Sequence, residues 1–329
     1  MRLLQKLLTK LNGLHYTQEY LCFAKESLSQ PLHVYLVNDK CVIKDITNQH
    51  AFVGYSPLVL AFPSLPGIVF PLSLRLIFSA RVLQPNEYFL KKDALATLEL
   101  RIIEEQLAGT QGAGRDNKIF FYEGVHGAHH FLSGFHQFIG RLNNDLYNKK
   151  PGNVFLHNNL YEQVKIAYAV PRGISLITVG KNDQFNLFPT DLHGQPDEDH
   201  YIISLRIGGK ACEQVEAMGK LVISQVHSDA CKMVYGLGKN HMQELRSKDN
   251  FPFSGRLSEN FKWPLPEQAL SYRELILLDS FTYGIHRILL FRIGFQQQPG
   301  AQTGTLAHIH NSFATWRYKN RLPGNYLLR

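Results

Sequence analysis

Two cations and two adjacent glycines stand close together in the segment SLRIGGKACEQVEAMG, residues 204–219. An apolar run ends at Arg206, Gly208 and Gly209 allow the backbone to approach a ligand closely, and Lys210 opens a run with helical spacing. The N–H groups at a helix start attract anions, and Arg can donate to two phosphate oxygens at once. The pattern therefore indicates a phosphate site. The alternative is an ordinary strand-to-helix turn that carries two surface cations.

A second row of polar groups lies in QFNLFPTDL, residues 184–192, after a β-branched run at 174–179 and a polar turn. Two such runs and their turn are typical of a β-hairpin. The return strand carries an amide, a hydroxyl and a carboxylate where a structural strand favours Val or Ile, and a proline, which belongs at a sheet edge or bulge. These residues are Asn186, Pro189, Thr190 and Asp191. They can hydrogen-bond a polar ligand, or they can simply face solvent.

Three histidines stand close together in the first half of VHGAHHFLSGFHQF, residues 125–138: His126, His129 and His130. The four-residue spacing of His126 and His130 occurs in metal sites on helices. No H-E-x-x-H motif accompanies them, and the neighbouring glycines weaken any helix. We therefore assign no metal ligands and interpret these residues as satisfied or interfacial histidines.

The composition is that of a folded globular protein, with 329 residues of which 44% are hydrophobic and 19% charged. That length allows two domains or one large one. The net charge is +8 and the pI is near 9.2, a balance that suits nucleic acid, an anionic membrane surface or anionic small molecules. The positive charges are scattered, and no run resembles a nucleic-acid-binding arm. No nucleic-acid partner is expected.

Membrane contact is not expected either. The most apolar segment, residues 56–78, is interrupted by prolines and cannot form the helix of roughly 18 apolar residues that a membrane span requires. The leucine-rich start of the chain, up to Gly13, favours a packing helix over a targeting segment. The four cysteines are far apart and show no CxxC pairing, so reduced thiols in a cytoplasmic protein are expected.

The first half of the chain mixes strand and helix patterns. Short strands are expected in HVYLVND, CVIKDI, PLSLRLIFSARVL and NKIFFYEG. Helices are expected at 91–109, where apolar residues have helical spacing before Gly109, and at 127–150, where two lysines mark the last turn. We expect an α+β domain at 1–150. Its boundary is expected in NKKPGN, because Pro-Gly after a charged helix end typically terminates a helix and begins a loop.

The second half, 151–329, is predicted to be mainly β. Short apolar runs follow one another at hairpin-like distances, and helical patterns interrupt them at 208–219 and near 228–239. Many short antiparallel strands with few helices indicate a closed or partly closed barrel.

From about 160 to 318 the chain resembles the flavin reductase-like family, whose members bind FMN on a split antiparallel β-barrel. Three segments carry the resemblance, in the family's order and spacing: ISLITVGKNDQFNLFPTDL, YIISLRIGGKACEQVEAMGKLVISQV and PLPEQALSYRELILLDSFTYGIHRILLFRIG. Residues 1–150 have no counterpart in the minimal family domain.

The resemblance implies which residues hold the cofactor. The FMN phosphate would bind at the phosphate site, and the return strand would run beside the ribityl chain and the ring edge, with Pro189 marking a bulge. The implied FMN-binding residues are Asn186, Pro189, Thr190, Asp191, Ser204, Arg206, Gly208, Gly209 and Lys210. His286, in YGIHRILLF, matches a family histidine close to the flavin and the nicotinamide, and it is the implied catalytic residue.

The implied function is an FMN oxidoreductase that passes hydride from NAD(P)H to the flavin and electrons on to an acceptor. Family barrels are usually homodimers, and a homodimer is expected here. Ile285 stands where the family usually has Asp, and Ala211 stands where a Ser or Thr usually donates to the phosphate. These departures favour the alternative, a non-catalytic FMN-binding electron carrier or binding module on the same barrel.

Overall fold

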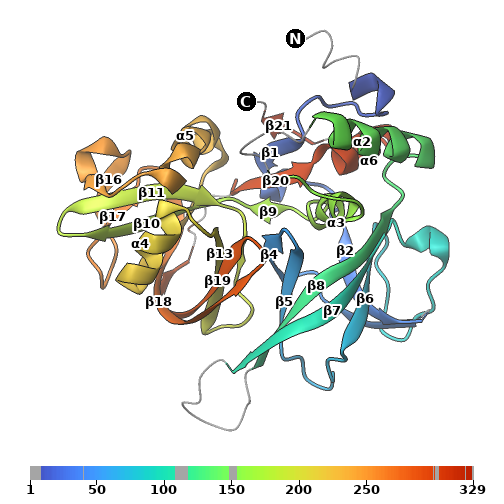
Figure 1. Cartoon of the computed structure of the whole chain (residues 1–329), viewed down its shortest axis with the longest axis horizontal. Helices are drawn as coiled ribbons and strands as arrows, with labels where there is room; N and C mark the ends of the chain where they lie inside the picture. The colour runs from blue at the N-terminus through green and yellow to red at the C-terminus, as the bar shows by residue number, and fades with distance from the viewer. Residues whose placement is uncertain are drawn as a thin grey trace. The chain divides into compact units, whose positions relative to one another are not determined.

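The structure is a computed structural model that describes residues 9–39, 41–107, 118–147, 154–298, 300, 304–322 and 324–327 (Figure 1). The chain divides into two compact units. Unit 1 comprises Met1–Leu21, Ser29–Val170 and Ile309–Gly324, and unit 2 comprises Cys22–Leu28, Pro171–His308 and Asn325–Arg329. Within the described ranges, no helix is both long enough and apolar enough to cross a membrane.

The predicted domain boundary falls within residues 148–153, which lie outside the described part of the chain. The units divide at Val170 and Pro171 instead, and Ile309–Gly324 also belongs to unit 1. Helix α3 (Leu160–Ala167) accounts for the later division, because it packs against a strand of unit 1.

Unit 1 contains a seven-stranded antiparallel sheet with the order β3-β2-β6-β7-β8-β5-β4. The strands are β2 (His33–Asn38), β3 (Cys41–Asp45), β4 (Ala51–Tyr55), β5 (Leu58–Pro63), β6 (Ser73–Ser79), β7 (Ala96–Leu107) and β8 (Lys118–His129). A 3-10 helix, η2 (Lys91–Asp93), precedes β7. Apolar side chains fill the core of the sheet, among them the buried Val34, Leu60, Leu98 and Phe121.

The helix predicted at 91–109 is wrong, because β7 occupies most of this segment; Gly109 lies outside the described residues. Burial alternates along the strand, with Ala96, Leu98 and Leu100 inside and Thr97, Glu99 and Arg101 between them. A period of two fits a strand with one covered face. Leu95, Leu98 and Ile102 also have helical spacing, so the same run satisfies both patterns.

Unit 1 contains the helices α2 (Gly134–Tyr147), α3 and α6 (Asn311–Lys319). The helix predicted at 127–150 therefore starts too early, since residues 127–129 are part of β8. A Cβ atom at Gly124 would lie 2.1 Å from Oε1 of Gln163 on α3, and one at Gly127 would lie 3.0 Å from the Gln163 side chain. The glycines thus allow strand and helix to pack closely.

Unit 2 is mostly β, and its main sheet is antiparallel with the order β12-β13-β19-β18-β14-β10-β11-β15. The strands are β10 (Ser175–Lys181), β11 (Gln184–Thr190), β12 (His193–Gly194), β13 (His200–Arg206), β14 (Lys220–Val226), β15 (Arg246–Ser247), β18 (Ala269–Tyr283) and β19 (His286–Gln297). Among the described residues the sheet does not close, because β12 and β15 are its two end strands.

Shorter elements complete the fold. Paired strands are β1 (Tyr20–Ala24) with β21 (Tyr326–Leu327), β9 (Arg172–Gly173) with β20 (Leu306–His310), and β16 (Phe253–Leu257) with β17 (Pro264–Pro266). The helices of unit 2 are α4 (Lys210–Met218) and α5 (Cys231–Leu237), with 3-10 helices η1 (Lys25–Ser27), η3 (Ser228–Ala230), η4 (Gly238–Met242) and η5 (Lys248–Asn250).

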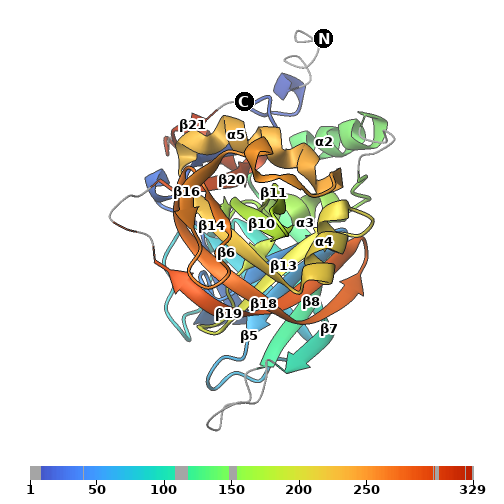
Figure 2. The ribbon, with the colours of Figure 1, turned by 90° about the vertical axis from the view of Figure 1, so that its left-hand side faces the viewer.

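The central strands of unit 2 are buried on both faces. Leu176 and Val222 belong to one apolar cluster, whereas their neighbours Ile177 and Leu221 belong to another. The long pair β18–β19 shifts register at two points of β18, and such bulges bend a strand pair. Figure 2 shows the bend in both strands.

The predicted hairpin at 174–191 is confirmed. Strands β10 and β11 pair from Ser175 opposite Thr190 to Lys181 opposite Gln184, and the two turn residues between them have φ values of 50° and 59°, as a two-residue hairpin turn requires. No register shift interrupts the pair, so the bulge predicted at Pro189 is absent. Because β15 pairs only with the start of β11, Pro189 lies at an edge, where its missing N–H costs nothing.

Gly180→Ala should destabilise unit 2. A Cβ atom there would lie 2.1 Å from Cδ1 of Phe185 and 2.7 Å from the carbonyl oxygen of Gln184. We expect the free energy of unfolding to fall by about 1–3 kcal/mol, measured by urea denaturation. Gly173→Ala is the matched control, because nothing lies within 4 Å of its Cβ position. Equal stability of the two variants would contradict this packing.

Candidate functional site

The predicted phosphate site lies where β13 ends and α4 begins. Gly208 has a φ of 77°, a conformation that glycine adopts without strain, and Gly209 is the N-cap of α4 with no side-chain cap. The N–H of Gly209 donates to the carbonyl of Arg206 at 3.3 Å, and that of Cys212 to the carbonyl of Gly209 at 3.0 Å. In the described part of the chain, the N–H groups of Lys210 and Ala211 have no backbone acceptor. Free donors at a helix start are suited to an anion.

Beside these donors, Arg206 is exposed and Lys210 is half-buried. Lys210 Nζ lies 3.2 Å from Glu213 and 3.1 Å from Glu244, and the hydrogen bonds that it donates to Glu244 and then to Glu213 raise the pKa of Lys210. Arg206 takes part in no ion pair with the residues that the structure describes. The positive charge of Arg206 is therefore available to an anion, whereas that of Lys210 is shared with two surface carboxylates.

His286 lies directly opposite Arg206, because the two residues are Cα partners in the β13–β19 ladder. The side chain is buried, at 1% exposure, and its Nδ1 lies 3.1 Å from Oγ of Ser204. Burial, reinforced by the charge of Arg206, lowers the pKa of His286 to about 4. The imidazole is consequently neutral at physiological pH.

Asn186 holds protein groups rather than facing solvent. It is fully buried, and its Nδ2 donates to Oε1 of Gln214 at 2.8 Å, to the carbonyl of Asn240 at 2.9 Å and to that of Gln243 at 3.3 Å. Gln214 is on α4 and Asn240 on η4. This amide therefore fixes both elements against the hairpin. That role explains why the sequence has a polar residue in this strand.

Asp191 belongs to a polar chain that the sequence did not reveal. Its Oδ2 lies 2.9 Å from Nδ1 of His308, whose Nε2 lies 2.5 Å from Oη of Tyr235, and that hydroxyl lies 2.7 Å from Sγ of Cys22. The four residues are far apart in sequence, so no local pattern joins them. Thr190 is buried, and its Oγ1 accepts from the N–H of Leu192 at 3.3 Å.

The predicted residues thus fall into two groups within unit 2. The first surrounds the end of β13: Ser204, Arg206, Gly208, Gly209, Lys210 and His286. The second follows β11, where Asn186 reaches α4 through Gln214 and the carbonyl of Pro189 accepts from Nε2 of His241 at 2.8 Å. His126 and His129 are on strand β8 of unit 1, so the helical spacing considered for a metal site does not exist. Within the described ranges, no group of His, Cys, Asp and Glu side chains could hold a metal ion.

Comparison with known proteins gives matches among solved structures alone, since no family model and no curated protein matches the chain. The NADH:FAD oxidoreductase SgcE6 of Streptomyces globisporus C-1027 is 14% identical, with a TM-score of 0.41, and the match covers 50% of this chain and 96% of that chain. An FMN-binding protein from Thermus thermophilus, solved with bound p-hydroxybenzaldehyde, is 17% identical over 50% of this chain and 94% of its own, with a TM-score of 0.36.

A third match is BorF, the flavin reductase component of a bacterial two-component tryptophan halogenase. It is 15% identical, with a TM-score of 0.39, and the match covers 46% of this chain and 94% of BorF. The flavins in these names belong to those proteins, and a cofactor for this chain has to be argued from its own residues.

The ring of His286 should stay neutral far below the usual titration range of histidine. With a pKa lowered to about 4, its NMR ring signals should not move between about pH 8 and about pH 5. An unfolded histidine binds its proton near pH 6.5, so this residue lowers the free energy of unfolding as the pH falls from about 6.5 to about 4. His286→Asn assigns the signal by removing it. Titration of that signal near pH 6.5 would show that the ring is not buried.

Proposed function

We propose that this chain is an FMN-binding oxidoreductase that accepts hydride from NAD(P)H onto the flavin and passes electrons to an acceptor. The observation that carries the proposal is the start of α4, where unpaired backbone N–H groups, an exposed Arg206 and a half-buried Lys210 gather beside the buried His286. A phosphate monoester needs this combination of donors and positive charge.

The partners of Lys210 do not exclude a phosphate. Glu213 and Glu244 are exposed by 61% and 72%, and exposed ion pairs typically contribute only about 0–1 kcal/mol. A phosphate dianion offers more negative charge than either carboxylate, and it can also accept from the N–H groups of Lys210 and Ala211. Lys210 therefore substitutes for the hydroxyl that Ala211 lacks.

Apolar surface next to the phosphate site supports a flat aromatic ligand. Ile207 is 47% exposed and Met242 is 63% exposed, and Sδ of Met242 lies 3.9 Å from the position of a Cβ atom at Gly209. The isoalloxazine ring is planar and largely apolar, and methionine makes favourable contacts with aromatic rings. In the proposed complex the ring covers part of this surface, and the ribityl chain runs toward Thr190 and Asp191 on β11.

The bound flavin would supply the hydride chemistry at its N5 atom, and the protein would bind and orient it. Arg206, Lys210 and the backbone of Gly208 and Gly209 would hold the phosphate. His286 would present a neutral ring that exchanges hydrogen bonds without introducing a charge, and Ser204 would fix the orientation of that ring. Asn186 would act indirectly, because it holds α4 in place through Gln214 and would not itself bind the flavin.

The proposal extends to assembly and compartment. The bent sheet of unit 2 would be the split barrel of the flavin reductase-like family, and two copies would form a homodimer through that barrel. Among the described residues, Cys22, Cys41, Cys212 and Cys231 form no disulfide, which suits a cytoplasmic protein.

A second function, that of a non-catalytic FMN electron carrier, is favoured by one position. Ile285 occupies the turn before His286, where related proteins place a carboxylate. Without that group, nothing on the described turn orients a nicotinamide by charge, although the phosphate site is unaffected. Reduction by NAD(P)H separates the two functions.

Removing both cations should weaken FMN binding selectively. The Arg206→Ala/Lys210→Ala variant loses two charge-assisted contacts, each worth roughly 1.5–3 kcal/mol, so the Kd for FMN should rise at least about tenfold. The Kd for riboflavin, which lacks the phosphate, should stay the same. Fluorescence quenching on titration measures both constants. Anaerobic bleaching of the bound flavin by NADH or NADPH then distinguishes a reductase from a carrier.

The matched control is Lys181→Ala/Arg292→Ala, which removes two exposed cations elsewhere on the same sheet. FMN affinity should be unchanged in this variant. An equal loss in both variants would indicate a general charge effect, and no loss in either would place the phosphate elsewhere. Failure of the native protein to bind either flavin would refute both functions.

A further inference from the structure

Unit 1 contains a polar cavity with a volume of about 520 Å³. Residues from several elements line it, among them Asn12, Glu19, Tyr161, Lys165, His310 and Asn311. This volume suits a small organic molecule. The proposed flavin function in unit 2 does not use it.

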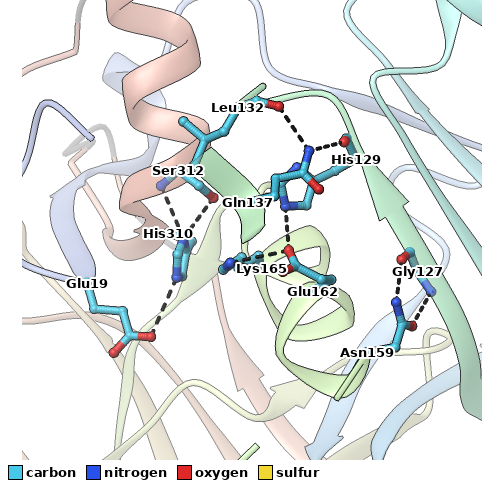
Figure 3. Close-up of polar contacts among 10 residues, drawn as sticks. All are labelled: Glu19, Gly127, His129, Leu132, Gln137, Asn159, Glu162, Lys165, His310 and Ser312. Carbon is cyan, nitrogen blue, oxygen red and sulfur yellow. Dashed lines mark hydrogen bonds and ion pairs between the residues drawn. The ribbon is translucent and has the colours of Figure 1, made fainter. Parts of the chain in front are cut away.

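A glutamate and a histidine face each other on the wall of this cavity. Nδ1 of His310 accepts from the backbone N–H of Ser312 at 3.1 Å, and it lies 2.8 Å from Oγ of the same residue. The neutral ring therefore carries its proton on Nε2, which lies 3.6 Å from Oε1 of Glu19 (Figure 3). That separation is longer than an ordinary hydrogen bond. Because the pKa values of both groups are lowered, the pair presents a carboxylate and a neutral imidazole, two proton acceptors, to the cavity.

Lys165 is a buried amine on the same wall. It is 4% exposed, and its Nζ lies 3.2 and 3.3 Å from the two oxygens of Glu162 and 3.9 Å from the ring centre of Tyr161. Glu162 also binds Nε2 of His129 at 2.7 Å, as Figure 3 shows. The Glu162 carboxylate, held from two sides, fixes the position of the Lys165 amine.

The charges that face Lys165 define what the cavity accepts. Burial lowers the pKa of Lys165, and Arg141 on α2 acts in the same direction, whereas Glu162 and Glu19 oppose it. His129 and His310 are neutral because burial lowers their pKa values, and burial raises the pKa of Tyr161 well above its usual value. With Glu162 paired to Lys165, the Glu19 carboxylate repels an anion. A neutral polar ligand fits best.

We propose that Lys165 is the nucleophile of a second site, where its amine forms an imine with a small neutral aldehyde or ketone. A buried lysine in a cavity is a recurring imine-forming group in proteins. The polar side chains of Asn12 and Asn311 suit hydroxyl groups on the carbonyl compound. The site does not depend on flavin.

The step balances without a further reactant. The ammonium of Lys165 gives one proton to the Glu19–His310 pair, and the resulting amine adds to the carbonyl carbon to form a C–N bond. One N–H proton then passes from the nitrogen to the former carbonyl oxygen, which gives a neutral carbinolamine. The same pair returns its proton to the carbinolamine hydroxyl, the C–O bond breaks, and water leaves. Ammonium and carbonyl compound thus become a protonated imine and water, with no oxidation or reduction.

Reductive trapping of the full-length protein tests this proposal. The protein is incubated with glycolaldehyde and sodium cyanoborohydride, and the modified lysines are located by peptide mass mapping. Lys165 should be modified faster than the exposed Lys91 and Lys92, because its lowered pKa leaves more of the amine in the neutral, nucleophilic form. Pyruvate, an anionic ketone, should label Lys165 more slowly than glycolaldehyde does. Labelling of Lys165 no faster than of Lys91 would overturn the proposal.

Two variants separate chemistry from structure. Glu162→Gln removes a group that holds the ammonium form, so the pH midpoint of Lys165 labelling should move to lower pH. Lys165→Met/Glu162→Gln removes both members of the pair and leaves no uncompensated charge; its fast adduct should be lost while its thermal melt stays cooperative. An undiminished fast adduct in the double variant would assign the reaction to another lysine. If that variant does not fold, the peptide map of the native protein decides alone.

Discussion

The candidate site of unit 2 depends on the antiparallel register between β13 and β19. Arg206 and His286 are 80 residues apart in sequence, and the ladder makes them Cα partners. The same register brings Ser204 close enough to bond the histidine ring. A shift of one residue would turn each side chain to the opposite face of the sheet. The phosphate donors, by contrast, need only the local turn into α4.

The second constraint is the buried amide of Asn186. The middle of α4 is held against the hairpin through Gln214, and η4 with its C-cap is held through the carbonyls of Asn240 and Gln243. A buried amide that loses such partners pays the desolvation cost without compensation. The polar residue in the return strand therefore has a structural role, because it holds α4 and η4. That role is compatible with a ligand beside the same strand.

The sequence predicted the local features well, because each depended on residues within a few positions of one another. The hairpin turn at 182–183, the start of α4 at Lys210 and the end of β13 at Arg206 were all readable in this way. The prediction failed in β7, where the apolar residues fit both the helical and the strand period. It also failed in β8, where the glycines allow close packing against α3 instead of ending a strand.

The cluster around Lys165 could not be predicted from the sequence, because its members are far apart along the chain. Glu162 and Lys165 stand three residues apart on α3, a spacing that usually indicates a solvated surface pair. Their significance depends on His129, Glu19 and His310, which lie on separate segments of the chain. In the fold both Glu162 and Lys165 are buried, and Lys165 lines a cavity. The local sequence pattern does not distinguish this buried pair from a surface pair.

The two candidate sites use burial for different ends. In unit 2 it keeps His286 neutral next to a cation, and the exposed Arg206 stays free to attract an anion. In unit 1 burial favours the neutral form of the Lys165 amine, while the carboxylates of Glu162 and Glu19 favour its ammonium form. The balance at Lys165 therefore depends on Glu162 and Glu19 as much as on burial, whereas the neutral state of His286 is set by burial and one nearby charge.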